Sequence, residues 1–263
     1  MSDALITLEN ATKIYGGKCV IDSVSHEFIK GESIAFYGHN GCGKSTMLKL
    51  LSGLISLSGG DIRYQKKLRF SYVPEKFAGT EIKMIDYLTG IARIENTDRS
   101  LVNGLIKDFF LGSMTGTRMD KLSKGSLQKV GVIQALMAPH DVIVLDEPLS
   151  GQDADSQEVF ITKVNALREQ GVTVFMSCHE RKLIDTLSDK VYTIDQGKLV
   201  SGMHAEESIY IVRVRRNEKL ALWPQMSING NRNEMRVSVA SLKETVMKLY
   251  EDGWEIVGIE EHD

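Results

Sequence analysis

The sequence predicts an α/β fold with an antiparallel β-subdomain, a helical insert and a small C-terminal α+β module. Residues 33–38 and 142–146 are short apolar runs, and the second is apolar up to its final aspartate, as in a parallel strand buried on both faces. A glycine-rich loop and an apolar helix follow the first run. Residues from about 82 to 138 instead carry helical periodicity, with no strong strand between their helices.

The other segments of the chain fit this fold in order. Residues 4–13 and 24–33 alternate apolar and polar side chains, as half-exposed antiparallel strands do. A helix is predicted over 156–171, with its apolar positions on one face and a glycine at its C-terminal end. We expect residues 172–177 to form another buried strand and residues 190–202 to form a hairpin.

The C-terminal segment, residues 206–263, has a different pattern. Alternating runs on either side of a turn indicate strands, and Ser241 with Glu244 forms a capping box that predicts a helix start. Gly253 is placed to end that helix, and a last apolar run follows. We therefore expect an α/β domain over residues 1–205 and a small β-β-β-α-β module after it.

Length and composition narrow the class of protein. A chain of 263 residues suits one large domain with an appendage, and a formal net charge of −3 argues against a general nucleic-acid binder. The chain has no apolar run near the ~20 residues of a membrane span, and its acidic N-terminus is unlike a signal peptide. Cys19, Cys42 and Cys178 give neither a disulfide framework nor a zinc pattern, so we expect a reduced, cytosolic protein.

The loop GHNGCGKST, residues 38–46, matches the phosphate-binding pattern G-x-x-x-x-G-K-[ST]. Its glycines let successive N–H groups converge on phosphate oxygens, and the next helix adds its positive N-terminus. Lys44 is placed to reach the β- and γ-phosphates and Ser45 to ligate Mg²⁺. The loop alone does not distinguish an ATPase from a GTPase or a kinase. The predicted nucleotide-binding residues of the loop are Gly38, Asn40, Gly41, Cys42, Gly43, Lys44, Ser45 and Thr46.

Two acidic residues end the buried strand, and a histidine follows the next one. Asp146 suits the second Mg²⁺ ligand, and Glu147 could polarise a water aimed at the γ-phosphate. His179 lies at the C-terminal end of its strand, which is the ligand side of a parallel sheet. Together with Lys44, Glu147 and His179 are the candidate catalytic residues.

Residues 122–126, LSKGS, predict a second phosphate-binding end at the start of a helix. Because one nucleotide already has its loop, this end favours a pair of chains in which one copy's loop and the other's helix share one ATP. A dimer with twofold symmetry would bury two identical sites of this kind. The alternative is an ordinary N-cap serine.

The ordered motifs GHNGCGKST, YVPE, LSKGS, VIVLDEP, SGQD and CHE resemble those of the ATP-binding subunits of ABC transporters, over about residues 4–203. The resemblance implies a P-loop ATPase fold, ATP and Mg²⁺ as ligands, and a head-to-tail dimer with a second ATP-binding subunit. It further implies that Tyr15 stacks on adenine and that Asp153 lies at the dimer seam. Ser123 and Gly125 would meet the partner's γ-phosphate.

The resemblance also assigns the catalytic base to Glu147 and the switch histidine to His179. The sequence departs from the family at Lys124 and Ser126, where the signature LSGGQ has Gly and Gln, and at Glu75, where many members have Gln. The serine and the second glycine of the signature are present as Ser123 and Gly125, so the contact with phosphate should be retained. A carboxylate at Glu75 can still reach Mg²⁺. The segment before Glu75 is shorter than usual, so the edge of the β-subdomain should be trimmed.

The resemblance implies a motor that drives a separate integral membrane permease. LSKGS is similar to the signatures of bacterial exporters, so export is expected; an importer subunit and a soluble ABC-type ATPase acting on DNA or ribosomes are the alternatives. A single ATPase half without heptads or basic excess argues against the last, and no nucleic-acid partner is expected. We expect a cytoplasmic protein, peripheral on the inner face of the cell membrane. The C-terminal module could regulate, dimerise or cover a sheet edge.

Overall fold

The computed structural model describes residues 4–149, 151–203, 209–215, 220, 223, 226–229 and 232–262. The chain divides into two compact units, Met1–Met203 and His204–Asp263. The boundary predicted between residues 205 and 206 lies outside the described residues. None of the helices in the described part of the chain has the length and hydrophobicity needed to span a bilayer.

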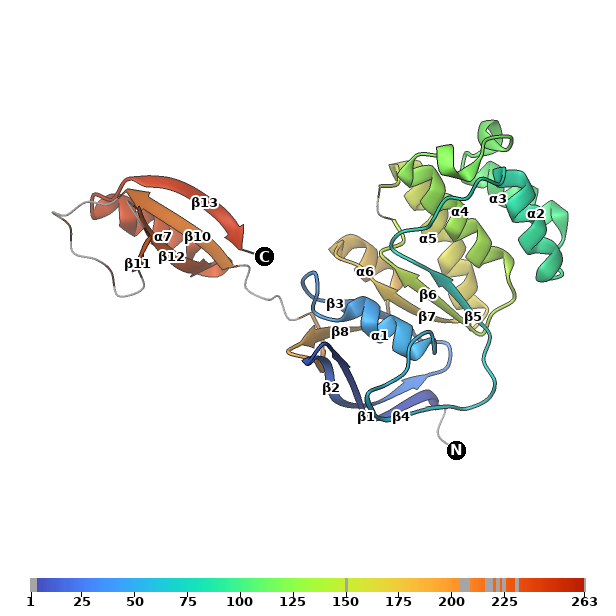
Figure 1. Ribbon diagram of the computed structural model, residues 1–263, viewed down its shortest axis with the longest axis horizontal. Coiled ribbons are helices and arrows are strands. Elements are labelled where there is room, and N and C mark those ends of the chain that lie inside the picture. The colour runs from blue at the N-terminus through green and yellow to red at the C-terminus, as the bar shows by residue number, and fades with distance from the viewer. Residues whose placement is uncertain are drawn as a thin grey trace. The chain divides into compact units, whose positions relative to one another are not determined.

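A six-stranded sheet forms the centre of the first unit (Figure 1). Its order is β5 (Phe70–Val73), β6 (Val142–Asp146), β7 (Thr173–Ser177), β3 (Ser33–Tyr37), β8 (Lys190–Asp195) and β9 (Lys198–Ser201). Neighbours from β5 to β8 run parallel, and β9 returns antiparallel to β8 as the predicted hairpin. Every residue of β6 and β7 is buried, which explains why both strands are largely apolar.

The two faces of this sheet support separate hydrophobic cores. One face packs on α1 (Lys44–Leu51) and on a three-stranded antiparallel sheet of order β2 (Lys18–Ile29), β1 (Ala4–Tyr15) and β4 (Gly59–Tyr64). The other face packs on α4 (Lys124–Met137), α5 (Ala154–Glu169) and α6 (Arg181–Leu187). Ile143 belongs to one core and Val144 to the other, because successive strand residues point to opposite faces.

The predicted insert is helical throughout its described elements. It consists of α2 (Met84–Ile94), α3 (Arg99–Asp108) and α4, with short 3₁₀ turns at Gly112–Met114 and Met119–Lys121. The apolar residues of α2 and α3 pack into the core that also contains α4. Figure 1 shows α2 and α3 on the far side of this unit from β2. The predicted fold class is therefore confirmed.

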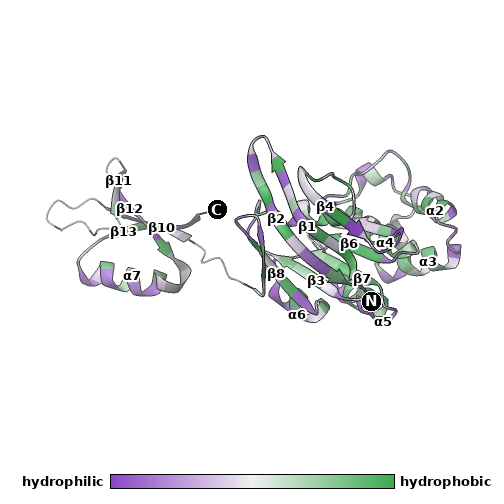
Figure 2. Ribbon diagram, turned by 90° about the horizontal axis from the view of Figure 1, so that it is seen from below, coloured by the Kyte–Doolittle hydropathy of each residue, from purple (hydrophilic) through white to green (hydrophobic). Residues whose placement is uncertain are grey.

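The second unit contains β10 (Ile209–Arg215), β11 (Met226–Asn229), β12 (Arg232–Ser238), α7 (Val239–Glu251) and β13 (Ile256–His262). Its four strands form an antiparallel sheet of order β11-β12-β10-β13. Hydrophobic and hydrophilic positions alternate along α7 (Figure 2), and its Leu249 is buried with Val212 and Trp254. The helix begins two residues before Ser241, so the predicted start at that residue is wrong: α7 follows β12 without an intervening loop.

Candidate active site

The phosphate-binding loop connects β3 to α1, as predicted. Gly43 has φ +120, and a Cβ there would lie 3.1 Å from Cγ1 of Val20 and 3.2 Å from its carbonyl oxygen. The close approach of β2 therefore requires glycine at this position. Gly43 is also the N-cap of α1 and offers no side-chain acceptor to the first N–H groups of the helix. Those donors are suited to an anion at the loop.

Lys44 is buried and folded over its own loop. Its Nζ donates hydrogen bonds to the carbonyl oxygens of Gly38 (2.7 Å) and His39 (3.1 Å). An ammonium group has three donors, so one remains for another acceptor. The loop thus holds a positive charge beside the space that a phosphate would enter.

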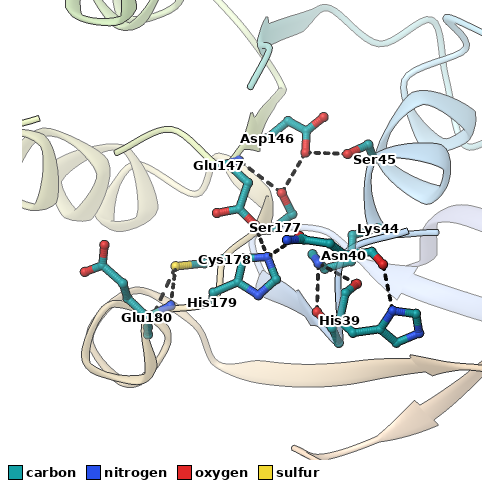
Figure 3. A network of polar contacts seen from close by, with 11 residues as sticks. His39, Asn40, Lys44, Ser45, Asp146, Glu147, Ser177, Cys178, His179 and Glu180 are labelled. Atoms are coloured by element: carbon teal, nitrogen blue, oxygen red, sulfur yellow. Dashed lines mark hydrogen bonds and ion pairs between the residues drawn. The ribbon is translucent and has the colours of Figure 1, made fainter. Parts of the chain in front are cut away.

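Asp146, at the end of β6, is the centre of a hydroxyl network (Figure 3). Its Oδ1 accepts hydrogen bonds from Oγ of Ser45 (2.9 Å) and Oγ of Ser177 (2.7 Å). Its Oδ2 accepts one from the Tyr72 hydroxyl at 2.9 Å. Burial, the Asp146 charge and this hydrogen bond raise the pKa of Tyr72 above its usual value, so the phenol stays a donor.

Glu147 follows in a left-handed backbone conformation, with φ +47. Its N–H donates to Oγ of Ser177 at 3.0 Å and to the backbone carbonyl oxygen of the same residue at 3.3 Å. Its Oε1 lies 3.0 Å from Nε2 of His179, and the same nitrogen lies 3.0 Å from Oδ1 of Asn40. Only the contact with Asn40 has hydrogen-bond geometry, so Oε1 of Glu147 is buried without a hydrogen-bond partner among the described residues.

The carboxyl group of Glu147 and the imidazole of His179 both have shifted pKa values. Burial raises the pKa of Glu147 to about 7; Asp146 and Glu75 add to the rise, and Lys44 opposes it. Burial, with a smaller contribution from the Lys44 charge, lowers the pKa of His179. A carboxyl group with a pKa near neutrality can take up and release a proton at physiological pH, which suits a general base.

A cavity of about 580 Å³ opens at this edge of the sheet, a volume in the range of small-molecule sites. It brings together the loop, Glu147, His179 and Glu75. Its lining residues are Val20, Asn40, Gly41, Gly43, Lys44, Ser45, Thr46, Glu75, Glu147 and His179. Asp146 lies behind it, hydrogen-bonded to Ser45. Gly38 and Cys42 belong to the loop but do not line the cavity.

Ser123, Gly125 and Asp153 form a separate group. Ser123 caps α4 by accepting a hydrogen bond from the N–H of Ser126 at 3.1 Å, and Asp153 caps α5. A Cβ on Gly125 would lie 2.4 Å from the carbonyl oxygen of Gly151, so the two helix starts are packed against each other. None of the three lines the cavity.

Tyr15, the predicted adenine contact, ends β1 with its side chain 46 % exposed. Nζ of Lys13 lies 5.0 Å from the centre of its ring, within the range of a cation–π contact. Tyr15 does not line the cavity, whereas Val20 of the adjoining strand does. The free protein therefore leaves the tyrosine ring exposed to solvent.

Tyr72, Ser177 and Lys129 are site residues that the sequence analysis did not identify. Tyr72 and Ser177 reach Asp146 from β5 and β7, the strands on either side of β6. Nζ of Lys129 lies 2.6 Å from Oδ2 of Asp153. Ser177 could have been identified from the sequence, because it carries a hydroxyl group and stands at the end of a predicted central strand. The other two depend on strand order and helix packing.

The residues present fit a nucleotide with Mg²⁺. The loop offers backbone donors and an ammonium group, and the buried Oε1 of Glu147 lacks a hydrogen-bond partner among the described residues. Ser45 and Asp146 place a hydroxyl and a carboxylate 2.9 Å apart, which are the hard oxygen ligands that Mg²⁺ takes beside substrate phosphates. Fold and cavity together define a P-loop nucleotide-binding protein.

Comparison with known proteins specifies the class further. A family model described as ABC transporter matches residues 21–150. An ABC transporter ATP-binding protein of Methanocaldococcus jannaschii is 32% identical over 201 residues, which cover 74% of this chain and 76% of the relative. A zinc import ATP-binding protein of Rickettsia conorii is 32% identical over 211 residues, which cover 78% of this chain and 89% of that relative. The chain belongs to the family of ABC transporter ATP-binding subunits, and it is an ATPase.

Solved structures support the same fold. The structure of an ATP-binding subunit of an ABC transporter aligns with a TM-score of 0.68 at 23% identity, over 76% of this chain and 90% of the other. A post-hydrolysis dimer of an ATP-binding cassette with bound ADP and Pi aligns with a TM-score of 0.67 at 19% identity, over 74% and 96%. At such identities the likeness concerns the fold.

Proposed function

We propose that the chain drives a separate membrane permease, most directly an exporter, by closing head-to-tail on a second ATP-binding subunit. One observation carries the proposal. The loop, Glu147 and His179 converge on one cavity, whereas the second predicted phosphate-binding end, at Ser123 and Gly125, lies outside the cavity lining. A partner subunit would supply that end to the open side of the cavity.

The roles within the cavity follow from its geometry. Lys44 would bind the β- and γ-phosphates with the donor that its loop leaves free. Ser45 and Asp146 would hold Mg²⁺, with Glu75 as a further oxygen at the cavity wall. The bound metal would neutralise phosphate charge in hydrolysis. Tyr15 would provide the adenine contact from the exposed end of β1.

Glu147 is the proposed general base. Its carboxylate group lines the cavity, and Oε1, which has no hydrogen-bond partner among the described residues, is held 3.0 Å from Nε2 of His179. The group is thus placed to accept a proton from an attacking water. His179 bridges Asn40 of the loop and Glu147, and would therefore sense whether the loop is occupied. Asp153, the N-cap residue of α5, would lie at the dimer seam, paired with Lys129 of α4.

The direction of transport has two candidates. Export rests on the LSKGS signature and on Glu75, both similar to exporters with a separate permease. Import is favoured by a different observation: several relatives at 27–32% identity are named zinc import ATP-binding proteins. In either case the chain would work in the cytoplasm, peripheral on the inner face of the membrane through its permease.

The test is co-purification from native membranes. A tagged Glu147→Gln chain would be loaded with ATP to hold the closed dimer, and its partners would be identified after solubilisation. We expect a stoichiometric protein with several membrane spans, whose architecture and transport assay in vesicles decide between export and import. Recovery of only soluble partners or nucleic acid, with the chain absent from membranes, would contradict the transporter role.

A further inference from the structure

Three hydroxyl groups surround the carboxylate of Asp146, and they come from three different elements. Ser45 donates from α1, Ser177 from β7 and Tyr72 from β5. The register explains the last two: Asp146 pairs with Ser177, and Tyr72 pairs with Val144, two residues before Asp146 on the same strand. Asp146 and Ser177 are fully or almost fully buried, so water does not replace these donors.

The three donors divide between the two carboxylate oxygens. Oδ1 accepts from Ser45 and Ser177, and Oδ2 accepts from Tyr72. If Ser45 turns to a metal, each oxygen of Asp146 still keeps one O–H donor. Two donors on opposite oxygens fix the plane of a carboxylate, in the way that partners of metal ligands generally do.

Ser177 has a second contact, with the backbone of Glu147. Its Oγ accepts a hydrogen bond from the Glu147 N–H at 3.0 Å while donating one to Asp146 at 2.7 Å. The backbone carbonyl oxygen of Ser177 shares the same N–H at 3.3 Å, so the hydroxyl is the shorter of two acceptors. Glu147 has φ +47, a conformation that costs a non-glycine residue on the order of 1 kcal/mol and persists only where the surroundings hold it. A single hydroxyl thus joins the backbone of Glu147 to the side chain of Asp146.

We propose that Tyr72 and Ser177 are positioning residues of the ATPase reaction: they hold the Asp146 carboxylate in one orientation, and Ser177 also fixes the backbone that directs Glu147 into the cavity. The inference rests on the roles proposed above for Asp146 and Glu147. Neither residue lines the cavity, so both act through the acidic pair. Losing either hydroxyl should impair turnover more than it impairs nucleotide binding.

Tyr72→Phe is the primary test, because it removes one hydroxyl and keeps the ring. Its matched control is Tyr64→Phe: the Tyr64 hydroxyl donates to the carbonyl oxygen of Leu51 at 3.3 Å, away from the cavity. We expect Tyr72→Phe to lower kcat about 10- to 100-fold, the range for partners of metal ligands. KM for ATP should change less than about threefold, and the control should keep wild-type kinetics.

Ser177→Ala and Ser177→Thr test the second residue. The alanine variant should lose turnover as Tyr72→Phe does, and the threonine variant, which keeps a hydroxyl, should regain most of it. Thr173→Val is the control for removing a buried hydroxyl from the same strand: Thr173 lies at the opposite end of β7 from Ser177, and its Oγ1 accepts a hydrogen bond from the N–H of Gly31 at 2.8 Å. Melting temperatures without nucleotide would compare the folding of each variant with its control.

A binding measurement distinguishes a positioning role of Tyr72 from a general loss of activity. In the Glu147→Gln background, a fluorescent ATP analogue would be titrated in EDTA and in Mg²⁺. We expect Tyr72→Phe to leave the affinity in EDTA unchanged and to reduce the gain in affinity that Mg²⁺ gives. Wild-type kcat in both Tyr72→Phe and Ser177→Ala, or equal losses in their controls, would overturn the proposal. Wild-type turnover of Glu147→Gln would instead refute the assignment on which it rests.

Discussion

Nζ of Lys129 lies 2.6 Å from Oδ2 of Asp153, and this ion pair joins the middle of α4 to the N-cap residue of α5. The two side chains differ in exposure, 10 % for Lys129 and 57 % for Asp153. The hydrogen bond from Lys129, with those from Ser156, holds the pKa of Asp153 well below its usual range. The pair therefore consists of a buried cation and a largely exposed anion.

This asymmetry predicts that the two partners differ in their contribution to stability. Asp153→Asn should lower the free energy of unfolding by about 1–2 kcal/mol, because it leaves a nearly buried ammonium group without its carboxylate. Asparagine caps helices as well as aspartate, so the loss would report the ion pair. Lys129→Met should be milder, since it leaves only an exposed carboxylate. Urea unfolding measures both, and a larger loss for Lys129→Met would contradict the prediction.

The raised pKa of Glu147 predicts a pH-dependent stability in nucleotide- and metal-free protein. Between the ordinary carboxyl value of 4.5 and about 7, the unfolded chain releases a proton that the folded chain retains, so stability falls as pH rises through this window. Glu147→Gln removes the effect. Allowing for solvent screening, its stability gain over wild type should grow by about 1–2 kcal/mol from pH 5 to pH 8.

Thermal unfolding in EDTA would measure this difference as a shift of several degrees. Glu158→Gln, which removes a carboxylate from the exposed side of α5, controls for the loss of one negative charge. A constant difference between Glu147→Gln and wild type across this pH range would show that Glu147 is ionised normally in the folded state.

Gly125→Ala should separate turnover from nucleotide binding. A Cβ there would lie 2.4 Å from the carbonyl oxygen of Gly151, a backbone atom that can yield only if its segment moves. We expect turnover to fall on the order of tenfold or more, with an ATP affinity within about threefold of wild type, because the loop at 38–46 is untouched. Gly104→Ala, in α3 with nothing within 4 Å of its Cβ, is the control. Equal turnover in the two variants would contradict the prediction.

The site residues that stand directly beside a strand in the sequence could be predicted from the sequence alone. The loop precedes α1, Asp146 ends β6 with Glu147 directly after it, and His179 follows β7, so each could be placed by reading one strand and its next residues. Parallel strands then bring these ends to one edge, which the sequence pattern also predicts. The contacts of Asn40 and Glu147 with His179 agree with that expectation.

Contacts across strands and between helices could not be predicted in this way. Tyr72 reaches Asp146 only because β5 lies beside β6, and neither strand order nor register can be read from residues 70–73. The pairing of Lys129 with Asp153 depends on how α4 packs against the start of α5. The start of α7 was misplaced because a capping box is a local signal, whereas here the helix continues directly from β12.

We propose that ATP is hydrolysed in the cavity between the loop and Glu147, with the Glu147 carboxylate as base. The most direct measurement is steady-state ATP turnover of purified Glu147→Gln, with binding of a fluorescent ATP analogue measured on the same sample. We expect turnover at least 100-fold below wild type with binding within about threefold, as for removal of a general base. Turnover close to that of wild type would show that Glu147 is not the base and would contradict the account.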